Sequence, residues 1–170
     1  MIAVLLYPVK RGATTIWEKW DAVKEDGTPE GSLNHYSYGA IVGWLFSTAA
    51  GIEPAEPGYR KIRIAPHPGG SLAWAEAEMN TANGHITSRW EIKDDTCIFD
   101  MHVPVNTHAE LILPVPADDL LSAPDVNRID ASSEQASFAL LPGSYRFVVK
   151  WKKSYRNIRR NLLCLSCVEI

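Results

Sequence analysis

The amino-acid sequence predicts a mainly β protein, an antiparallel β-sandwich preceded by a short α-helical segment. After Gly58 the chain breaks into short apolar runs that are separated by turn residues. In two of these runs the residues alternate between two faces, as in strands that bury one side. Before Pro54 the apolar residues recur at helical spacing instead. The change of pattern at Glu53-Pro54-Ala55-Glu56-Pro57-Gly58 predicts a domain boundary there.

The expected helix runs from Tyr36 to Ala50 and ends at Gly51. Its apolar residues at helical spacing are Tyr38, Ile41, Trp44, Leu45, Ala49 and Ile52. A single helix of about fifteen residues cannot form a core by itself, because most helical stability comes from packing. The segment 1–53 therefore packs either on the sandwich or on helices outside this chain, and we expect the second.

Seven strands are expected in the second part of the chain. They are Tyr59–Ala65, Leu72–Asn80, Gly84–Ile92, Thr96–Val103, His108–Pro114, Ser137–Leu141 and Ser144–Trp151. The dipeptides Asn83-Gly84 and Asp94-Asp95 supply tight turns between neighbouring strands. Residues 120–135 have no clear period, so they are expected to form a loop with at most one weak strand. This many short strands over about ninety residues favours a β-sandwich.

The composition limits the possible partners. The formal net charge is −3 and the sequence pI is about 5.9, which does not favour nucleic acid. A basic run from Lys150 to Arg160 is expected to be a solvated tail. No eighteen consecutive residues are apolar, so no membrane partner is expected. The apolar opening Met1–Tyr7 lacks a basic leader, and we expect a cytoplasmic protein.

The three cysteines, Cys97, Cys164 and Cys167, do not indicate a disulfide framework, because their number is odd and no secretory signal accompanies them. Cys164 and Cys167 have the spacing of half a zinc site. No second pair or nearby histidine completes four ligands. We expect neither a metal nor a cofactor.

The segment Trp17-Glu18-Lys19-Trp20 combines side chains that carbohydrate sites use. Aromatic faces can stack on the apolar faces of sugar rings, and a carboxylate between them can activate a water molecule. The alternative is that Trp17 and Trp20 anchor a core while Glu18 is solvated or ion-paired. The residues alone leave both interpretations open.

Three blocks, in this order and spacing, resemble the end of the inverting bacterial α-L-rhamnosidases. They are Thr-Thr-Ile-Trp-Glu-Lys-Trp-Asp at 14–21, Ser-Leu-Asn-His-Tyr-Ser-Tyr-Gly-Ala at 32–40, and Pro-Gly-Tyr-Arg-Lys-Ile-Arg-Ile-Ala-Pro-His-Pro-Gly-Gly at 57–70. Pro-Val-Asn-Thr-His-Ala at 104–109 resembles a strand and turn of the same family. The resemblance covers residues 12–151.

The resemblance implies a fold and a domain order. Residues 1–53 would close a six-hairpin α/α barrel that holds the active site, as a remnant of the catalytic domain. Residues 57–151 would be the C-terminal β-sandwich domain, followed by the basic tail 152–170. The helices on which the expected helix packs would then belong to the upstream barrel.

The resemblance also implies a reaction, the hydrolysis of terminal non-reducing α-L-rhamnose with inversion. Glu18 matches the position of the general base, and His35 matches a position that contacts the sugar, with Trp17 and Trp20 beside it. The general acid lies upstream in the family, so the chain alone is expected to be inactive. Its expected partners are a rhamnose-containing glycoside or oligosaccharide and the missing N-terminal part. The alternative is a non-catalytic β-sandwich, either a structural or a carbohydrate-binding module.

Overall fold

The computed structural model describes residues 7–36, 39–152 and 154–155. It divides into two compact units, the first ending at Trp44 and the second beginning at Leu45. In the first unit, one helical turn at residues 7–10 precedes an irregular segment, and helix α2 spans Ala40–Trp44. Cys164 and Cys167, and most of the basic tail, lie outside the described residues.

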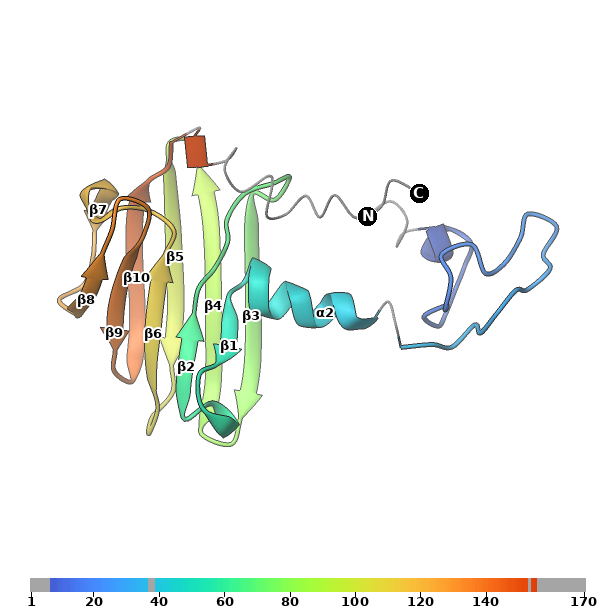
Figure 1. Cartoon of the computed structure of the whole chain (residues 1–170), viewed down its shortest axis with the longest axis horizontal. Helices are drawn as coiled ribbons and strands as arrows, with labels where there is room; N and C mark the ends of the chain where they lie inside the picture. Colours follow the sequence, from blue (N-terminus) through green and yellow to red (C-terminus); the bar gives the residue numbers. More distant parts are fainter. Residues whose placement is uncertain (1–6, 37–38, 153, 156–170) are drawn as a thin grey trace. The chain divides into compact units, whose positions relative to one another are not determined.

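The second unit is a β-sandwich of two five-stranded sheets, which confirms the predicted architecture (Figure 1). One sheet has the order β1-β2-β6-β9-β8 and the other β3-β4-β5-β10-β7. Strands β2 and β6 are parallel, and the remaining neighbours are antiparallel. The strands are β1 (Ile52–Pro54), β2 (Lys61–Ile64), β3 (Trp74–Thr81), β4 (Gly84–Lys93), β5 (Thr96–Val103), β6 (His108–Leu113), β7 (Leu120–Ser122), β8 (Asn127–Ala131), β9 (Ala136–Leu140) and β10 (Gly143–Lys150).

The core lies between the inner faces of the two sheets. Alternate residues of β4 and β5 point inward, among them Trp90 and Phe99, which are fully buried. Phe138 of the first sheet meets Phe147 of the second, with ring centroids 5.0 Å apart. All seven expected strands are present, with ends within two residues of the prediction. Alternation is clearest in β4 and β5, where buried residues alternate with more exposed ones.

Three strands were not predicted. Strand β1 occupies Ile52–Pro54, where Ile52 was assigned to the helical pattern, and it pairs with β2 at the edge of the sheet. Proline is tolerated there because an edge strand leaves one row of backbone groups unpaired. The segment 120–135 contains two strands, β7 and β8, rather than one at most. Both are edge strands, and all five residues of β8 are exposed, so no buried face produced an alternating pattern.

The helix is shorter than predicted. It covers Ala40–Trp44 and continues as a π-helical turn, η2, over Leu45–Ala49. Tyr36 lies outside the helix and is 84% exposed, and residues 37–38 are outside the described part. The helix starts late because the preceding residues, as far as His35, are hydrogen-bonded to an earlier segment of the chain. Among the residues that the structure describes, no helix is long and apolar enough to cross a membrane.

The end of η2 is attached to the sandwich by buried hydrogen bonds. Ser88 Oγ donates to the carbonyl of Ala50, and Trp90 Nε1 donates to that of Ala49, each over 2.7 Å. Gly51, which follows, has a φ of +80° and pairs with Ala65. These contacts fix the point where the chain enters β1. The limits predicted for the domains, at residues 53 and 57, stay a prediction.

Candidate functional site

The predicted site residues lie in one hairpin-like segment of the first unit, residues 15–35. Its two arms are joined by backbone hydrogen bonds. His35 N donates to Ile16 O over 2.7 Å, and Glu18 N donates to Ser32 O over 2.9 Å. The first two of the three blocks, which lie about a dozen residues apart in the sequence, are therefore side by side in the structure.

The tip of this hairpin is a tight turn. Asp26 Oδ1 accepts a hydrogen bond from the backbone N of Thr28, and Gly27 supplies a φ of +86°. Lys24 N donates to Thr28 O, and Val23 bridges Pro29 in antiparallel fashion. Asx turns of this kind reverse the chain locally. The turn brings the two arms back together.

Ion pairs also link the two arms. Glu30 contacts Lys19 Nζ and Lys24 Nζ, each at 2.8 Å, and Lys24 contacts Asp21 at 3.1 Å. Hydrogen bonds from Lys19 and Lys24 lower the pKa of the Glu30 carboxyl from 4.5 to about 2. These groups are exposed, so each pair contributes little stability in water. Their effect is to hold Glu30 in its charged form across the neutral range.

The Glu18 side chain is fixed by the opposite arm. Its Oε2 accepts a hydrogen bond from the backbone N of Ser32 over 2.9 Å. The neighbouring Gly31 has a φ of +80°, and a Cβ at this position would lie 3.1 Å from Glu18 Oε2. The side chain of Glu18 is exposed, and Oε1 takes no part in this hydrogen bond. The carboxylate is thus oriented through Oε2.

The aromatic residues of the site differ in exposure. Trp17 is buried, at 5% exposed, while Trp20 is 43% exposed and meets Tyr7 edge to face at 5.2 Å. His35 is half-buried and stacks on Tyr36, with ring centroids 4.9 Å apart. Trp17 is buried, as the alternative interpretation of the sequence expected of a tryptophan that anchors a core. Trp20 and Tyr36 present rings that another molecule can reach.

Sequence reasoning missed two features of this hairpin. It did not single out Gly31, whose missing side chain leaves room for the Glu18 carboxylate, or Glu30, which joins the two arms. Gly31 lies between Glu30 and Ser32, but none of its neighbours in the sequence indicates that the Glu18 side chain packs against it. Only the pairing of the arms shows this. In the described part of the chain, no three His, Cys, Asp or Glu side chains are grouped to hold a metal ion.

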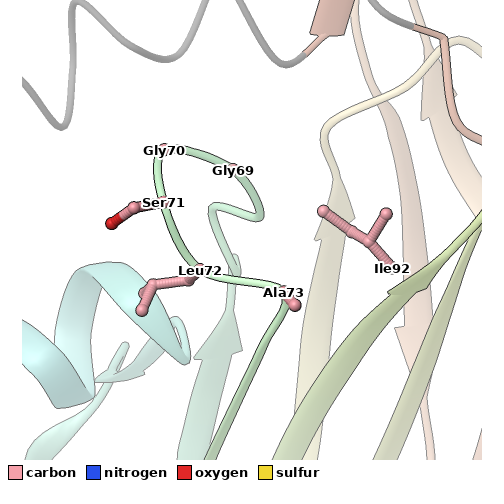
Figure 2. A pocket seen from close by; sticks show the side chains of 6 residues that line it. All are labelled: Gly69, Gly70, Ser71, Leu72, Ala73 and Ile92. Atoms are coloured by element: carbon pink, nitrogen blue, oxygen red, sulfur yellow. The ribbon is translucent and has the colours of Figure 1, made fainter.

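A pocket of about 240 Å³ lies in the second unit, at the loop that leads into β3 (Figure 2). Ser71 is its one lining residue with a polar side chain, and in Figure 2 that side chain extends away from Ile92. The remaining lining residues are Gly69, Gly70, Leu72, Ala73 and Ile92. The lining offers no acid, base or cation, so it does not form a catalytic site by itself.

Two family models match consecutive parts of the chain. The bacterial alpha-L-rhamnosidase six-hairpin glycosidase domain matches residues 4–49, and the bacterial alpha-L-rhamnosidase C-terminal domain matches residues 51–128. The chain belongs to the bacterial α-L-rhamnosidase family. The match to the first model includes the whole hairpin that carries Glu18 and His35.

The relatives are much longer than this rhamnosidase-family chain. It is 37% identical over 147 residues to the alpha-L-rhamnosidase of Streptomyces avermitilis, covering 84% of this chain and 14% of that protein. It is 38% identical over 157 residues to an alpha-L-rhamnosidase of Formosa agariphila, covering 85% and 17%. The crystal structure of the Streptomyces avermitilis enzyme complexed with L-rhamnose matches with a TM-score of 0.76 and 35% identity, over 85% of this chain and 14% of that chain.

Proposed function

We propose that this chain supplies the last part of the catalytic barrel and the C-terminal sandwich of an α-L-rhamnosidase. The reaction is the hydrolysis of terminal non-reducing α-L-rhamnose with inversion, in a rhamnose-containing glycoside or oligosaccharide. The observation that carries the proposal is the hairpin 15–35, in which Glu18 is held against Ser32 beside the His35 block. The similarity to enzymes named alpha-L-rhamnosidase supports the choice of substrate.

In this proposal Glu18 is the general base. An inverting hydrolase needs a carboxylate that takes a proton from water on the face of the sugar opposite the leaving group. The hydrogen bond from Ser32 N to Oε2 orients the Glu18 carboxylate. Oε1, which takes no part in that hydrogen bond, is the oxygen that would receive the proton. His35 contacts the sugar, and the exposed ring of Trp20 supplies a stacking surface.

The second carboxyl group, the general acid, comes from the part of the barrel that precedes this segment. In inverting enzymes the two groups stand roughly 6.5–9.5 Å apart, so that water fits between base and sugar. Within the described hairpin, the carboxylates of Asp21 and Glu30 are already bound to lysines. A lowered pKa makes Glu30 a poor proton donor near neutral pH. The part of the barrel that precedes the matched segment in the relatives is therefore the proposed partner of this chain.

The test is the activity of the 170-residue chain on an aryl α-L-rhamnoside. The proposal predicts no saturable release of rhamnose, because acid and base do not occur together in the chain. Folding is monitored in parallel by circular dichroism, since the sandwich gives a strong β signal. Saturable turnover that Glu18→Gln abolishes would show that the general acid is present in this chain. It would overturn the proposal that the acid comes from the preceding part of the barrel.

A further inference from the structure

The outer face of the sheet β3-β4-β5-β10-β7 carries an exposed tryptophan that the proposed reaction does not use. Trp74 begins β3, at the edge of the sheet, and is 55% exposed. Because side chains alternate between the two faces of a strand, Glu76, Glu78 and Asn80 lie on the same face as Trp74. Trp74 therefore stands at the head of a row of polar side chains.

The plane of the Trp74 ring is held from one side. The guanidinium carbon of Arg89, on β4, lies 5.5 Å from the ring centroid. Arg89 is itself fixed by Glu76 at 2.9 Å and by Glu91 at 3.0 Å. These hydrogen bonds raise the pKa of Arg89 and keep it charged. A cation over one face of an indole ring stabilises that orientation, and leaves the opposite face for another molecule.

Hydrogen-bonding groups continue from Trp74 along the two strands. The cross-strand pairs Trp74↔Glu91, Glu76↔Arg89, Glu78↔Thr87 and Asn80↔His85 follow one another. Seven residues of an extended strand span roughly 20 Å, which is the length of several linked sugar units. His85 Nδ1 lies 2.9 Å from Asn80 Oδ1 and its Nε2 lies 3.6 Å from Glu78, so the far end of the row is also ordered.

The surroundings of Trp74 fit a sugar better than a protein. The centre of a protein–protein interface is depleted of charged residues, whereas Trp74 is flanked by Glu76, Arg89 and Glu91. Among the described residues of this sheet, the other large apolar side chain that is exposed is Leu121, on β7 at the opposite edge. One aromatic ring beside carboxylates and a guanidinium matches a pyranose, which has an apolar face and a rim of hydroxyl groups.

We propose that the outer face of β3 and β4 is a carbohydrate-binding site, in which a pyranose stacks on Trp74 and its hydroxyl groups bond to Glu76, Arg89 and Glu91. The ligand is an oligosaccharide or polysaccharide that extends along the row toward Asn80. This site lies in the sandwich and needs neither Glu18 nor the upstream barrel. The proposed function enters only in the choice of a rhamnose-containing probe.

The test is native gel electrophoresis of the 170-residue chain in gels that contain soluble rhamnogalacturonan. The wild-type chain is expected to be retarded in proportion to the polysaccharide concentration. Trp74→Ala should weaken binding at least about tenfold, as for other exposed aromatic anchors, while Trp74→Phe should keep most of the retardation. Leu121→Ala, the matched exposed apolar side chain of the same sheet, should bind as the wild type does.

Trp20→Ala tests the hairpin of the first unit in parallel, and Ile129→Ala, at an exposed apolar residue of β8 in the other sheet, should leave the retardation unchanged. All variants are compared with the wild type by circular dichroism and thermal unfolding, which should agree because the substituted side chains are exposed. The proposal is overturned if the wild-type chain is not retarded, if Trp74→Ala is retarded like the wild type, or if Trp20→Ala alone removes binding. Failure here would leave the role of Glu18 untouched, since the activity tests do not involve this face.

Discussion

At the scale of single residues, glycines at two positions make close backbone approaches possible. Gly31 admits the Glu18 carboxylate, and Gly51 admits the backbone of Ala65 and Pro66. A Cβ at Gly51 would lie 2.2 Å from Ala65 C and from Pro66 N, far below any allowed contact. The sequence indicated Gly51 correctly as the end of the helix. It did not indicate this contact, because the partner lies fourteen residues further along the chain.

Gly51→Ala should destabilise the protein strongly. The substitution combines a strained positive φ with a clash against backbone that cannot move aside, and we expect a loss of roughly 2–5 kcal/mol in the free energy of unfolding. Gly58→Ala is the matched control. It also has a positive φ, +69°, but no atom lies within 4 Å of the added Cβ, so its cost is about 1–2 kcal/mol. Urea denaturation of both variants measures the difference, and equal losses would contradict the contact.

The role of Glu18 depends on residues that the sequence could not connect. The order and spacing of the three blocks indicated the family, and the family supplied the role of the base. Sequence reasoning placed Trp17 and Trp20 together as sugar contacts, whereas the structure buries Trp17 and exposes Trp20. In a helix, two residues three positions apart lie on the same side. Trp17 and Trp20 have this spacing, but their segment is not helical, so the rings lie in different environments. Without the hairpin geometry, the sequence could not distinguish the two rings.

At the scale of elements, the sequence pattern predicted the strands inside the two sheets and the edge strand β3, but it missed the other three edge strands, β1, β7 and β8. β4 and β5 bury every second residue, which leaves a clear pattern in the sequence. β8 buries none of its residues, and β1 and β7 have three residues each, too few to show a period. Edge strands form because a neighbouring strand offers hydrogen-bonding partners, and that information is not local.

The segment after β10 is held by a contact that a pH titration can detect. Asp119, which is buried at 6% exposed, accepts hydrogen bonds from Lys152 Nζ at 2.7 Å and from the hydroxyl of Tyr155. Tyr155 also packs on Trp151, with ring centroids 5.5 Å apart. Burial raises the pKa of Asp119, but the bonds from Lys152 and Tyr155 outweigh burial and leave it below its usual value.

Asp119→Asn should therefore destabilise the protein in a pH-dependent way. A carboxyl whose pKa is lowered by folding stabilises the protein above its unfolded value of about 3.9, and this contribution is lost as the pH falls through the folded pKa. We expect a loss of roughly 1–3 kcal/mol at pH 7 that shrinks below about pH 4. Urea midpoints from pH 7 to pH 3 measure it, with the exposed Asp118→Asn as control. A difference that does not change with pH would contradict the ion pair.

At the scale of the whole molecule, the chain is one part of a longer arrangement known from its relatives. It spans 14% of the Streptomyces avermitilis enzyme and 17% of the Formosa agariphila enzyme. In the described part of residues 7–45, several large apolar side chains remain exposed, among them Val42 at 51% and Leu45 at 44% on the helical segment. The sequence predicted that this segment packs on helices from outside the chain. Apolar side chains such as Val42 and Leu45 are the ones that such helices would cover.

The most direct test of the account is a chimera in which the Streptomyces avermitilis enzyme carries this chain in place of its own matching segment. The tested variant of this chimera is Glu18→Gln. The matched control is Glu25→Gln, which changes an exposed carboxylate at the tip of the hairpin 15–35. With Glu18→Gln, turnover of an aryl α-L-rhamnoside should fall by about 10²- to 10⁴-fold while sugar binding persists, because the amide keeps the shape but cannot accept a proton. Proton NMR of the active chimera should show β-L-rhamnose as the first product. Normal turnover with Glu18→Gln would contradict the assignment of the base to Glu18.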